Sequence, residues 1–207
     1  MTIEILASGS SGNVAAVRSD GQLILIDCGK AYRWTIERLN HELPDALLVT
    51  HEHGDHSHAV KDFLKRGVEV YMTRGTADFL GIERHNLNLI IAGNELTISG
   101  VKVEVIESIH DAAEPVNFIL QDADDRVLFL TDTGALPDVS GDFTKIFIEA
   151  NYSEEVLLNA KLDLRQKWRI LENHLSLEQA EEFLAQYPRA EVSLIHRSTR
   201  HSEEEKS

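Results

Sequence analysis

Short apolar runs bounded by Gly, Asp and Asn recur through the first two thirds of the chain. Some alternate apolar with polar residues and others are continuously apolar, and both patterns predict short β-strands. The predicted strands cover residues 3–7, 14–18, 23–27, 46–50, 68–72, 101–109, 117–122, 127–131 and 145–150. One more apolar run, residues 192–195, predicts a final strand.

Stretches with apolar residues three and four positions apart lie between and after these strands, and they predict helices. The predicted helices cover residues 32–43, 57–66, 76–80, 154–173 and 177–186. Ser176, followed three residues later by Gln179, is a typical start of a helix. Strands that alternate with helices predict an α/β fold in which helices cover the sheets.

We expect one domain over residues 1–201, because no repeat, low-complexity linker or break in composition divides this range. Residues 202–207 include Glu203-Glu204-Glu205 and predict a disordered acidic tail.

The composition is that of a soluble globular protein, with 43% hydrophobic residues among 207. No apolar run approaches the roughly 20 residues that span a bilayer, and no signal peptide is recognisable, so we expect a cytoplasmic protein. The single cysteine, Cys28, excludes an internal disulfide and predicts a small buried apolar residue. Twenty basic against 35 acidic residues give a net charge of −15, which disfavours coating of nucleic acid by bulk electrostatics but allows a local basic patch.

Four of the ten histidines lie within residues 51–58. The motif His51-Glu52-His53-Gly54-Asp55-His56 follows a predicted strand and precedes a predicted helix, so its side chains belong to a loop at the end of a sheet. Imidazoles and a carboxylate at this spacing are ligands for zinc, manganese or iron. The motif supplies too few ligands for two metal ions.

Further ligand types end three other predicted strands. His110, Asp132 and His196 each stand at the end of an apolar run. A lone histidine after a strand is usually a capped or surface residue, but together with the motif these positions predict a metal site.

This order of motifs resembles the metallo-β-lactamase superfamily, and the resemblance covers essentially the whole chain. It implies an αββα sandwich of two mixed β-sheets covered by helices. A narrower resemblance, to the YycJ (WalJ) branch, is carried by residues 7–13, 27–29, 109–112, 115–116, 131–134, 149–151 and 174–176. That branch is related to the tRNase Z and RNase J nucleases, and it implies metal-dependent exonuclease activity. His58 and Leu177 depart from the pattern.

The resemblance implies a ligand set for two divalent ions, Zn²⁺ or Mn²⁺. One ion would be held by His51, His53 and His110, the other by Asp55, His56 and His196, with Asp132 bridging. Asp27 would either orient a ligand imidazole or cap the turn that follows it.

Two adjacent cations activate a bridging water and stabilise the attacking and leaving oxygens of a displacement. A hydroxide bridging the ions would attack the substrate, so no serine or cysteine nucleophile is needed. We take Asp55 and His174 as candidate catalytic residues, although His174 could instead cap a helix. A phosphodiester fits this site, and a thioester, lactone or β-lactam would fit as well.

Three features favour a phosphate-containing substrate. Asn13 lies in a glycine-rich loop that could bind an anion or form a simple turn. Arg197, Ser198 and Arg200 follow a predicted ligand and suit phosphate recognition. Lys161, Arg165, Lys167 and Arg169 form a basic stretch, which could equally be a solvated helix face paired with acidic neighbours.

The predicted function is a metal-dependent phosphodiesterase, most simply an exonuclease on DNA or RNA. The alternative is a phosphodiesterase for cyclic nucleotides or a hydrolase of another small anionic ester, because a net charge of −15 opposes steering of a long polyanion. A non-catalytic metal-binding protein is a third interpretation, disfavoured because a structural zinc site needs only four ligands. We expect a nucleic acid or nucleotide as substrate, no membrane, and a homodimer in which a second subunit supplies the missing clamp.

Overall fold

Two six-stranded sheets form the centre of the molecule. The computed structural model describes residues 1–197, so the predicted tail, Ser198 and Arg200 lie outside the described residues. The first sheet has the order β1 (Thr2–Ala7), β2 (Val14–Ser19), β3 (Gln22–Ile26), β4 (Ala46–Leu48), β5 (Glu69–Thr73), β6 (Leu87–Ile90). The second has the order β12 (Glu191–Ile195), β11 (Lys145–Glu149), β10 (Arg126–Leu130), β9 (Val116–Gln121), β8 (Val101–Glu107), β7 (Glu95–Ile98).

Both sheets are mixed. In the first, β1 to β3 pair antiparallel and β3 to β6 pair parallel. In the second, β7 to β10 pair antiparallel and β10 to β12 pair parallel. Each parallel connection requires a crossover, and helices make most of these crossovers.

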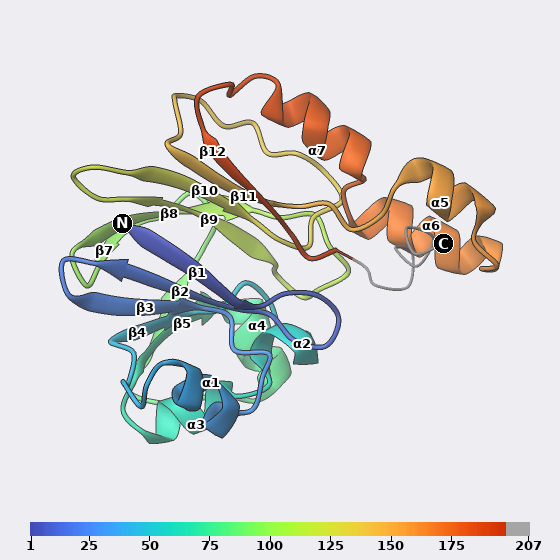
Figure 1. Ribbon diagram of the computed structural model, residues 1–207. Helices are drawn as coiled ribbons and strands as arrows, with labels where there is room; N and C mark the ends of the chain where they lie inside the picture. Colours follow the sequence, from blue (N-terminus) through green and yellow to red (C-terminus); the bar gives the residue numbers. More distant parts are fainter. Residues whose placement is uncertain (198–207) are drawn as a thin grey trace.

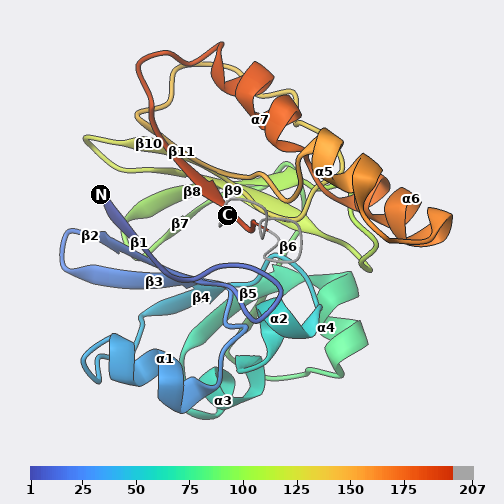
Figure 2. The same ribbon diagram turned by 45° about the vertical axis from the view of Figure 1, so that its right-hand side comes forward.

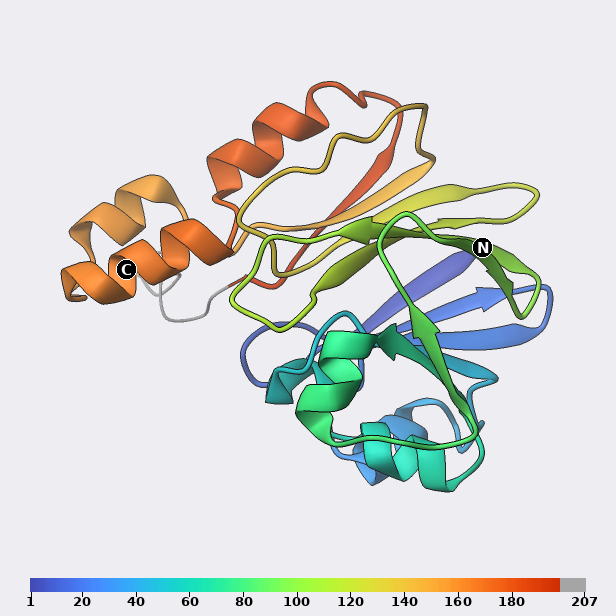
Figure 3. The same ribbon diagram turned by 180° about the vertical axis from the view of Figure 1, so that it is seen from behind.

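Helices lie on the outer faces of the sandwich (Figure 1). The first sheet is covered by α1 (Tyr32–Arg38), α3 (Val60–Lys65) and α4 (Arg74–Leu80), and the second by α7 (Leu177–Leu184). The short α2 (Gly54–Ser57) lies at the edge where the sheets end. The pair α5 (Glu154–Asn159) and α6 (Leu164–Asn173) projects beyond the sheets, as Figures 2 and 3 also show.

Strand β3 illustrates why the apolar runs are continuous. Ile24 and Ile26 pack between the sheets, whereas Leu23 and Leu25 pack against the outer helices. Because both faces of β3 are buried, its residues form an unbroken apolar segment and do not alternate between apolar and polar. The predicted α/β sandwich is confirmed.

The prediction of one helix over residues 154–173 is wrong. The chain leaves helical geometry at Ala160, and Asp163 starts a new helix, in which its side chain and that of Gln166 form a reciprocal capping box. The predicted start at Ser176 is confirmed by the same kind of box with Gln179. Strands β6 and β7 were not predicted, although each has a short alternation of apolar and polar residues comparable to that of residues 192–195.

Other boundaries shift by a few residues. Helix α1 ends before residue 43, because Asn40 and His41 adopt left-handed conformations. Strand β8 ends at Glu107, which leaves His110 in a loop. Among residues 1–197, no helix combines the length and apolar character needed to cross a membrane.

Candidate metal centre

The predicted ligands meet at one edge of the sandwich, where strands of both sheets end. The 51–56 motif follows β4, His110 follows β8, Asp132 follows β10 and His196 follows β12. This common edge explains how residues far apart in sequence reach one point.

Backbone contacts fix the position of the motif. The amide of Asn13 donates to the Asp55 carbonyl at 2.7 Å, and the amide of Cys28 donates to the His56 carbonyl at 2.7 Å. Gly29 lies so close that an added Cβ would sit 1.6 Å from the Asp55 oxygen. The turn after β3 therefore needs glycine at this position, and Cys28 beside it is buried, as its residue type suggested.

Ligand atoms gather in overlapping groups within 4.8 Å of one another. The groups are His51, His53 and His110; His51, His56 and Asp132; Asp55, His56 and His196; and Asp132, Glu149, His174 and His196. The first and third match the two triplets that the resemblance implied. The fourth includes Glu149, which the sequence analysis did not propose as a site residue.

Asp132 occupies the middle of the cluster. Its Oδ2 lies 3.3 Å from His56 Nε2, 3.6 Å from His110 Nε2 and 3.8 Å from His51 Nε2. Its Oδ1 lies 3.1 Å from His196 Nδ1. One carboxylate thus faces imidazoles of both triplets, the position that a bridging ligand requires.

Outer contacts orient the imidazoles. His56 Nδ1 lies 2.7 Å from Asp27 Oδ2, and His110 Nδ1 lies 3.0 Å from the carbonyl of Asn173. Asp27 also accepts hydrogen bonds from the amide and hydroxyl of Thr50. These contacts leave Nε2 of both imidazoles directed at the cluster, as in known metal sites.

The charges of the cluster are strongly coupled. Burial and the neighbouring His56 lower the pKa of His51, which keeps that imidazole neutral. Burial raises the pKa of Asp132, but His56 and His196 outweigh it and hold the pKa of this carboxyl well below its usual range. Burial lowers the pKa of His196, whereas Asp132, Asp55 and Glu149 raise it to about 10. The carboxylates therefore attract positive charge to this point, carried by a proton or by a metal ion.

Two buried nitrogens test whether this donor set fits a metal. In the part of the chain that the structure describes, His51 Nε2 and His196 Nε2 are buried without a hydrogen-bond partner. An unpaired buried nitrogen costs about 1–3 kcal/mol. Coordination to divalent metal would take up these lone pairs, so the residues present fit a metal site.

Glu149 is a site residue that sequence reasoning missed. It is the last residue of β11, and it accepts a hydrogen bond from the amide of Thr133 at 2.6 Å. Its Oε2 lies 3.0 Å from His174 Nδ1, so it holds that ring at the edge of the cluster. The available signal was its place in residues 149–151, one of the segments that carry the family resemblance. Asn151, which donates to the carbonyl of His196, was also missed.

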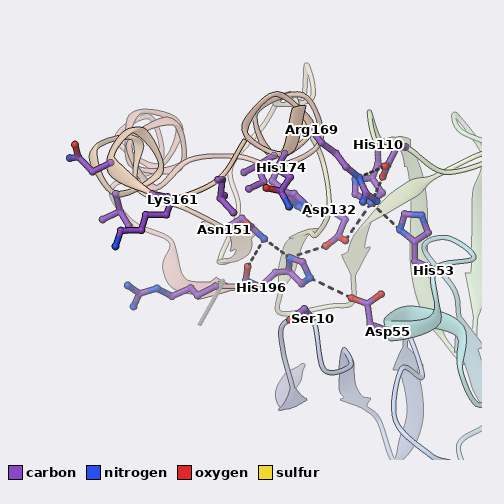
Figure 4. A pocket seen from close by; sticks show the side chains of 18 of the residues that line it. Ser10, His53, Asp55, His110, Asp132, Asn151, Lys161, Arg169, His174 and His196 are labelled. Carbon is purple, nitrogen blue, oxygen red and sulfur yellow. Dashed lines mark hydrogen bonds and ion pairs between the residues drawn. The ribbon is translucent and has the colours of Figure 1, made fainter. Parts of the chain in front are cut away.

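A pocket of about 1000 Å³ opens onto the cluster (Figure 4). His53, Asp55, His110, Asp132, His174 and His196 line it together with Arg197. Asn13, a predicted substrate-binding residue, is instead 7% exposed, and its amide lies 2.9 Å from His56 Nε2. The structure therefore places Asn13 outside the pocket lining and against the metal-facing nitrogen of His56, with its side-chain Oδ1 accepting a hydrogen bond from the amide of Gly9.

A histidine and carboxylate cluster at the edge of an αββα sandwich supplies the ligand types of a divalent-metal protein. The chain belongs to the metallo-β-lactamase superfamily, since residues 22–197 match the family described as the beta-lactamase superfamily domain. Membership and the donor cluster together imply a site for divalent metal.

Similar proteins carry nuclease names. The chain is 31% identical over 197 residues to exodeoxyribonuclease WalJ of Streptococcus pneumoniae, covering 86% of this chain and 73% of the relative. It is 28% identical over 183 residues to exodeoxyribonuclease YycJ of Bacillus anthracis, covering 81% and 69%. The metallo-β-lactamase fold protein YhfI of Bacillus subtilis shares the fold, with a TM-score of 0.76 and 14% identity over 95% and 86% of the two chains.

Proposed function

We propose that this chain is a metal-dependent phosphodiesterase that removes nucleotides from DNA, as the names of its WalJ and YycJ relatives state for those proteins. The observation that carries the proposal is the ligand cluster at the wall of an open pocket. Pocket and cluster together provide room for a phosphodiester next to the metal-binding side chains.

Two ions are proposed, of zinc or manganese. His51, His53 and His110 would hold one, Asp55, His56 and His196 the other, and Asp132 would contact both. Two triplets that share no residue, each with one unpartnered ring nitrogen, support this count. When bound, such ions supply Lewis acidity and an activated water.

The protein's own residues orient the substrate and move a proton. His174 lines the pocket, and Glu149 holds its Nδ1 at 3.0 Å, so Nε2 is the nitrogen available to a leaving oxygen. We assign His174 as the general acid on this geometry. Arg197 lines the same pocket and would bind a phosphate oxygen, whereas Asn13 holds Asp55 and His56 in place.

A small anionic ester is the second candidate substrate. The observation in its favour is the charge of the chain, with 35 acidic against 20 basic residues, which weakens long-range attraction of a polyanion. Salt separates the two candidates. Cleavage of a polymer should weaken steeply with added salt, and cleavage of a cyclic mononucleotide should not.

The test compares 5′-phosphorylated single-stranded DNA, RNA of the same sequence and a cyclic mononucleotide as substrates of protein loaded with Mn²⁺ or Zn²⁺. DNA should be shortened stepwise. Asp55→Ala and His53→Ala should each lower the rate at least about a hundredfold, because removing a ligand disturbs more than removing its outer partner.

His58→Ala is the matched control, since His58 is exposed and absent from the ligand groups. Elemental analysis should find two metal ions per wild-type chain and fewer in Asp55→Ala, with circular dichroism unchanged. Retained turnover in Asp55→Ala, or turnover of the cyclic mononucleotide alone, would contradict the proposed function.

A further inference from the structure

The pocket extends well beyond the metal centre. Figure 4 shows Lys161 at the end of the pocket opposite His53 and Asp55. The volume of the pocket, about 1000 Å³, lies at the upper end of the range for pockets that hold one small ligand. There is room for more than one nucleotide.

The α5–α6 arm, residues 154–173, forms the far wall. Lys161 stands in the turn between the two helices, and Gln166, Arg169 and Ile170 face the pocket from one side of α6. Three and four residues separate these α6 positions, so they share a helix face. The exposed Leu164, Trp168 and Leu171 also follow helical spacing, lie outside the pocket lining and mark a separate face.

The charge of the arm differs from that of the whole chain. The arm contains four basic and four acidic residues, so it carries no net charge within a chain of net charge −15, and all four cations lie in residues 159–171, which hold one acid. Only Lys161 and Arg169 among the four line the pocket. Arg169 donates from Nε to Asp111 at 2.8 Å, and Lys167 donates to the carbonyl of Leu158.

Of the two arm cations that line the pocket, Arg169 is paired with Asp111, which leaves Lys161 to contact a bound anion. Within residues 1–197 its ammonium takes part in no ion pair, and its side chain is exposed. Arg169 neutralises Asp111, which otherwise adds negative charge to the wall, and Glu155 is the remaining acid of the arm's lining. Gln166 and Asn159 add amide donors.

We propose that the α5–α6 arm is a binding site for the phosphates of a nucleic acid strand beyond the bond that is cleaved, with Lys161 as its principal contact. The proposal rests on the proposed function and specifies its substrate as an oligonucleotide rather than a single nucleotide. An ammonium group recognises phosphate as a point charge, without reading the base.

The test measures kcat/KM for a single-stranded DNA hexamer and for a one-nucleotide ester, thymidine 5′-p-nitrophenyl phosphate. Lys161→Ala should lower the ratio of hexamer to ester about three- to tenfold, and Lys161→Glu should lower it further, since one phosphate contact is lost. The slope of log kcat/KM for the hexamer against log salt should become shallower by about 0.7.

Arg165→Ala is the matched control, because Arg165 is an exposed cation of the same helix that does not line the pocket. Its ratio should equal that of the wild type. An equal fall in Arg165→Ala, or no fall in Lys161→Ala, overturns the proposal.

Inhibition separates this proposal from the proposed function. A phosphorothioate hexamer should compete with ester hydrolysis in the wild type and about three- to tenfold more weakly in Lys161→Ala. If the DNA hexamer is not cleaved but competition depends on Lys161, the nuclease assignment fails and the phosphate site stands. If the hexamer neither reacts nor competes, the arm is not a strand-binding site.

Discussion

Three residues of the metal centre have an uncommon backbone conformation. Asp27, Asp132 and His196 adopt φ angles of 61°, 42° and 50°, in the left-handed region. This conformation costs a residue with a side chain roughly 1–2 kcal/mol. Each of the three lies just beyond a strand, where the turn swings its side chain toward the cluster. Backbone strain of this kind is typical of functional sites, where it positions the side chains that act there.

Asp27 provides a test of orientation at the residue scale. Asp27→Asn keeps the size and the turn preference of the side chain but removes the charge beside His56 Nδ1. We expect metal affinity to fall about 10- to 100-fold, the usual effect of losing an outer partner of a ligand. Competition with a chromophoric chelator measures it.

Asp20→Asn is the control for Asp27→Asn. Asp20 has a similar φ of 47°, but it lies exposed in the turn between β2 and β3. Its substitution should leave metal affinity unchanged. Equal affinities in the two variants would show that Asp27 acts only as a turn residue.

Residues differ in how far their place in the site could be predicted. The histidine motif could be recognised from its spacing, and Asp132 and His196 from their positions at strand ends together with the family resemblance. Glu149 also stands at the end of an apolar run, as Asp132 does, but the resemblance gave a ligand role to Asp132 and none to Glu149. Its place depends on the amides of Thr133 and Leu175, which tertiary packing alone brings to it.

At the scale of elements, the C-terminal end of α6 supports the metal centre. The carbonyl of Asn173 accepts from His110, and the loop that carries Asp132 packs against Glu172. At Gly134 an added Cβ would lie 1.9 Å from the Glu172 carbonyl oxygen. The arm that walls the pocket therefore also sets the position of two proposed ligands.

Gly134→Ala should separate this loop from α6. We expect a loss of about 2–3 kcal/mol in the free energy of unfolding, because backbone must move to admit the methyl group. Urea unfolding measures the loss, and metal affinity should fall with it. Gly54→Ala is the control, since no atom lies within 4 Å of an added Cβ there. Comparable stability of the two variants would contradict the tight packing at Gly134.

Periodicity could not locate the break between α5 and α6. The apolar spacing of residues 154–173 continues across it, and the turn is set by the capping box of Asp163 and Gln166. Asp163 followed by Gln166 was a readable signal, of the same kind as Ser176 with Gln179. The short edge strands β6 and β7 also carried a readable signal, an alternation of apolar and polar residues, but over only four residues each.

At the scale of the molecule, a polar cluster joins the two sheets at the end opposite the metal centre. Lys145 Nζ donates to Asp125 Oδ2 at 2.7 Å and to the carbonyl of Met1. Burial raises the pKa of Asp125, but hydrogen bonds from Lys145, the Met1 ammonium and Thr144 lower it to about 2. The side chain is only 14% exposed, so solvent screens these contacts little.

This shift predicts a stability that depends on pH. A carboxyl whose pKa is lower in the folded state stabilises above its unfolded value of 3.8 and loses that effect as the pH falls toward about 2. Asp125→Asn should therefore cost about 2 kcal/mol at pH 7 and progressively less between pH 4 and pH 2. Urea unfolding across this range measures the difference. Asp124→Asn, in the same turn and exposed, should show none.

The whole-molecule architecture was the most predictable level. Apolar runs buried on both faces, as in β3, distinguish covered sheets from a half-exposed sheet. The assignment of strands to two sheets came from the family resemblance, because periodicity does not identify strand partners. Pairing depends on contacts between residues distant in sequence.

Each sheet is formed by one continuous half of the chain, residues 2–90 for the first and 95–195 for the second. During translation the first half emerges with the inner face of β2, β3 and β4 uncovered, and it stays so until the second half is made. The histidines of the 51–56 motif belong to this first half, and the remaining proposed ligands belong to the second half. A metal ion held by both halves would act as a cross-link that favours only their docked state, so chelation should weaken the joining of the halves more than either sheet alone.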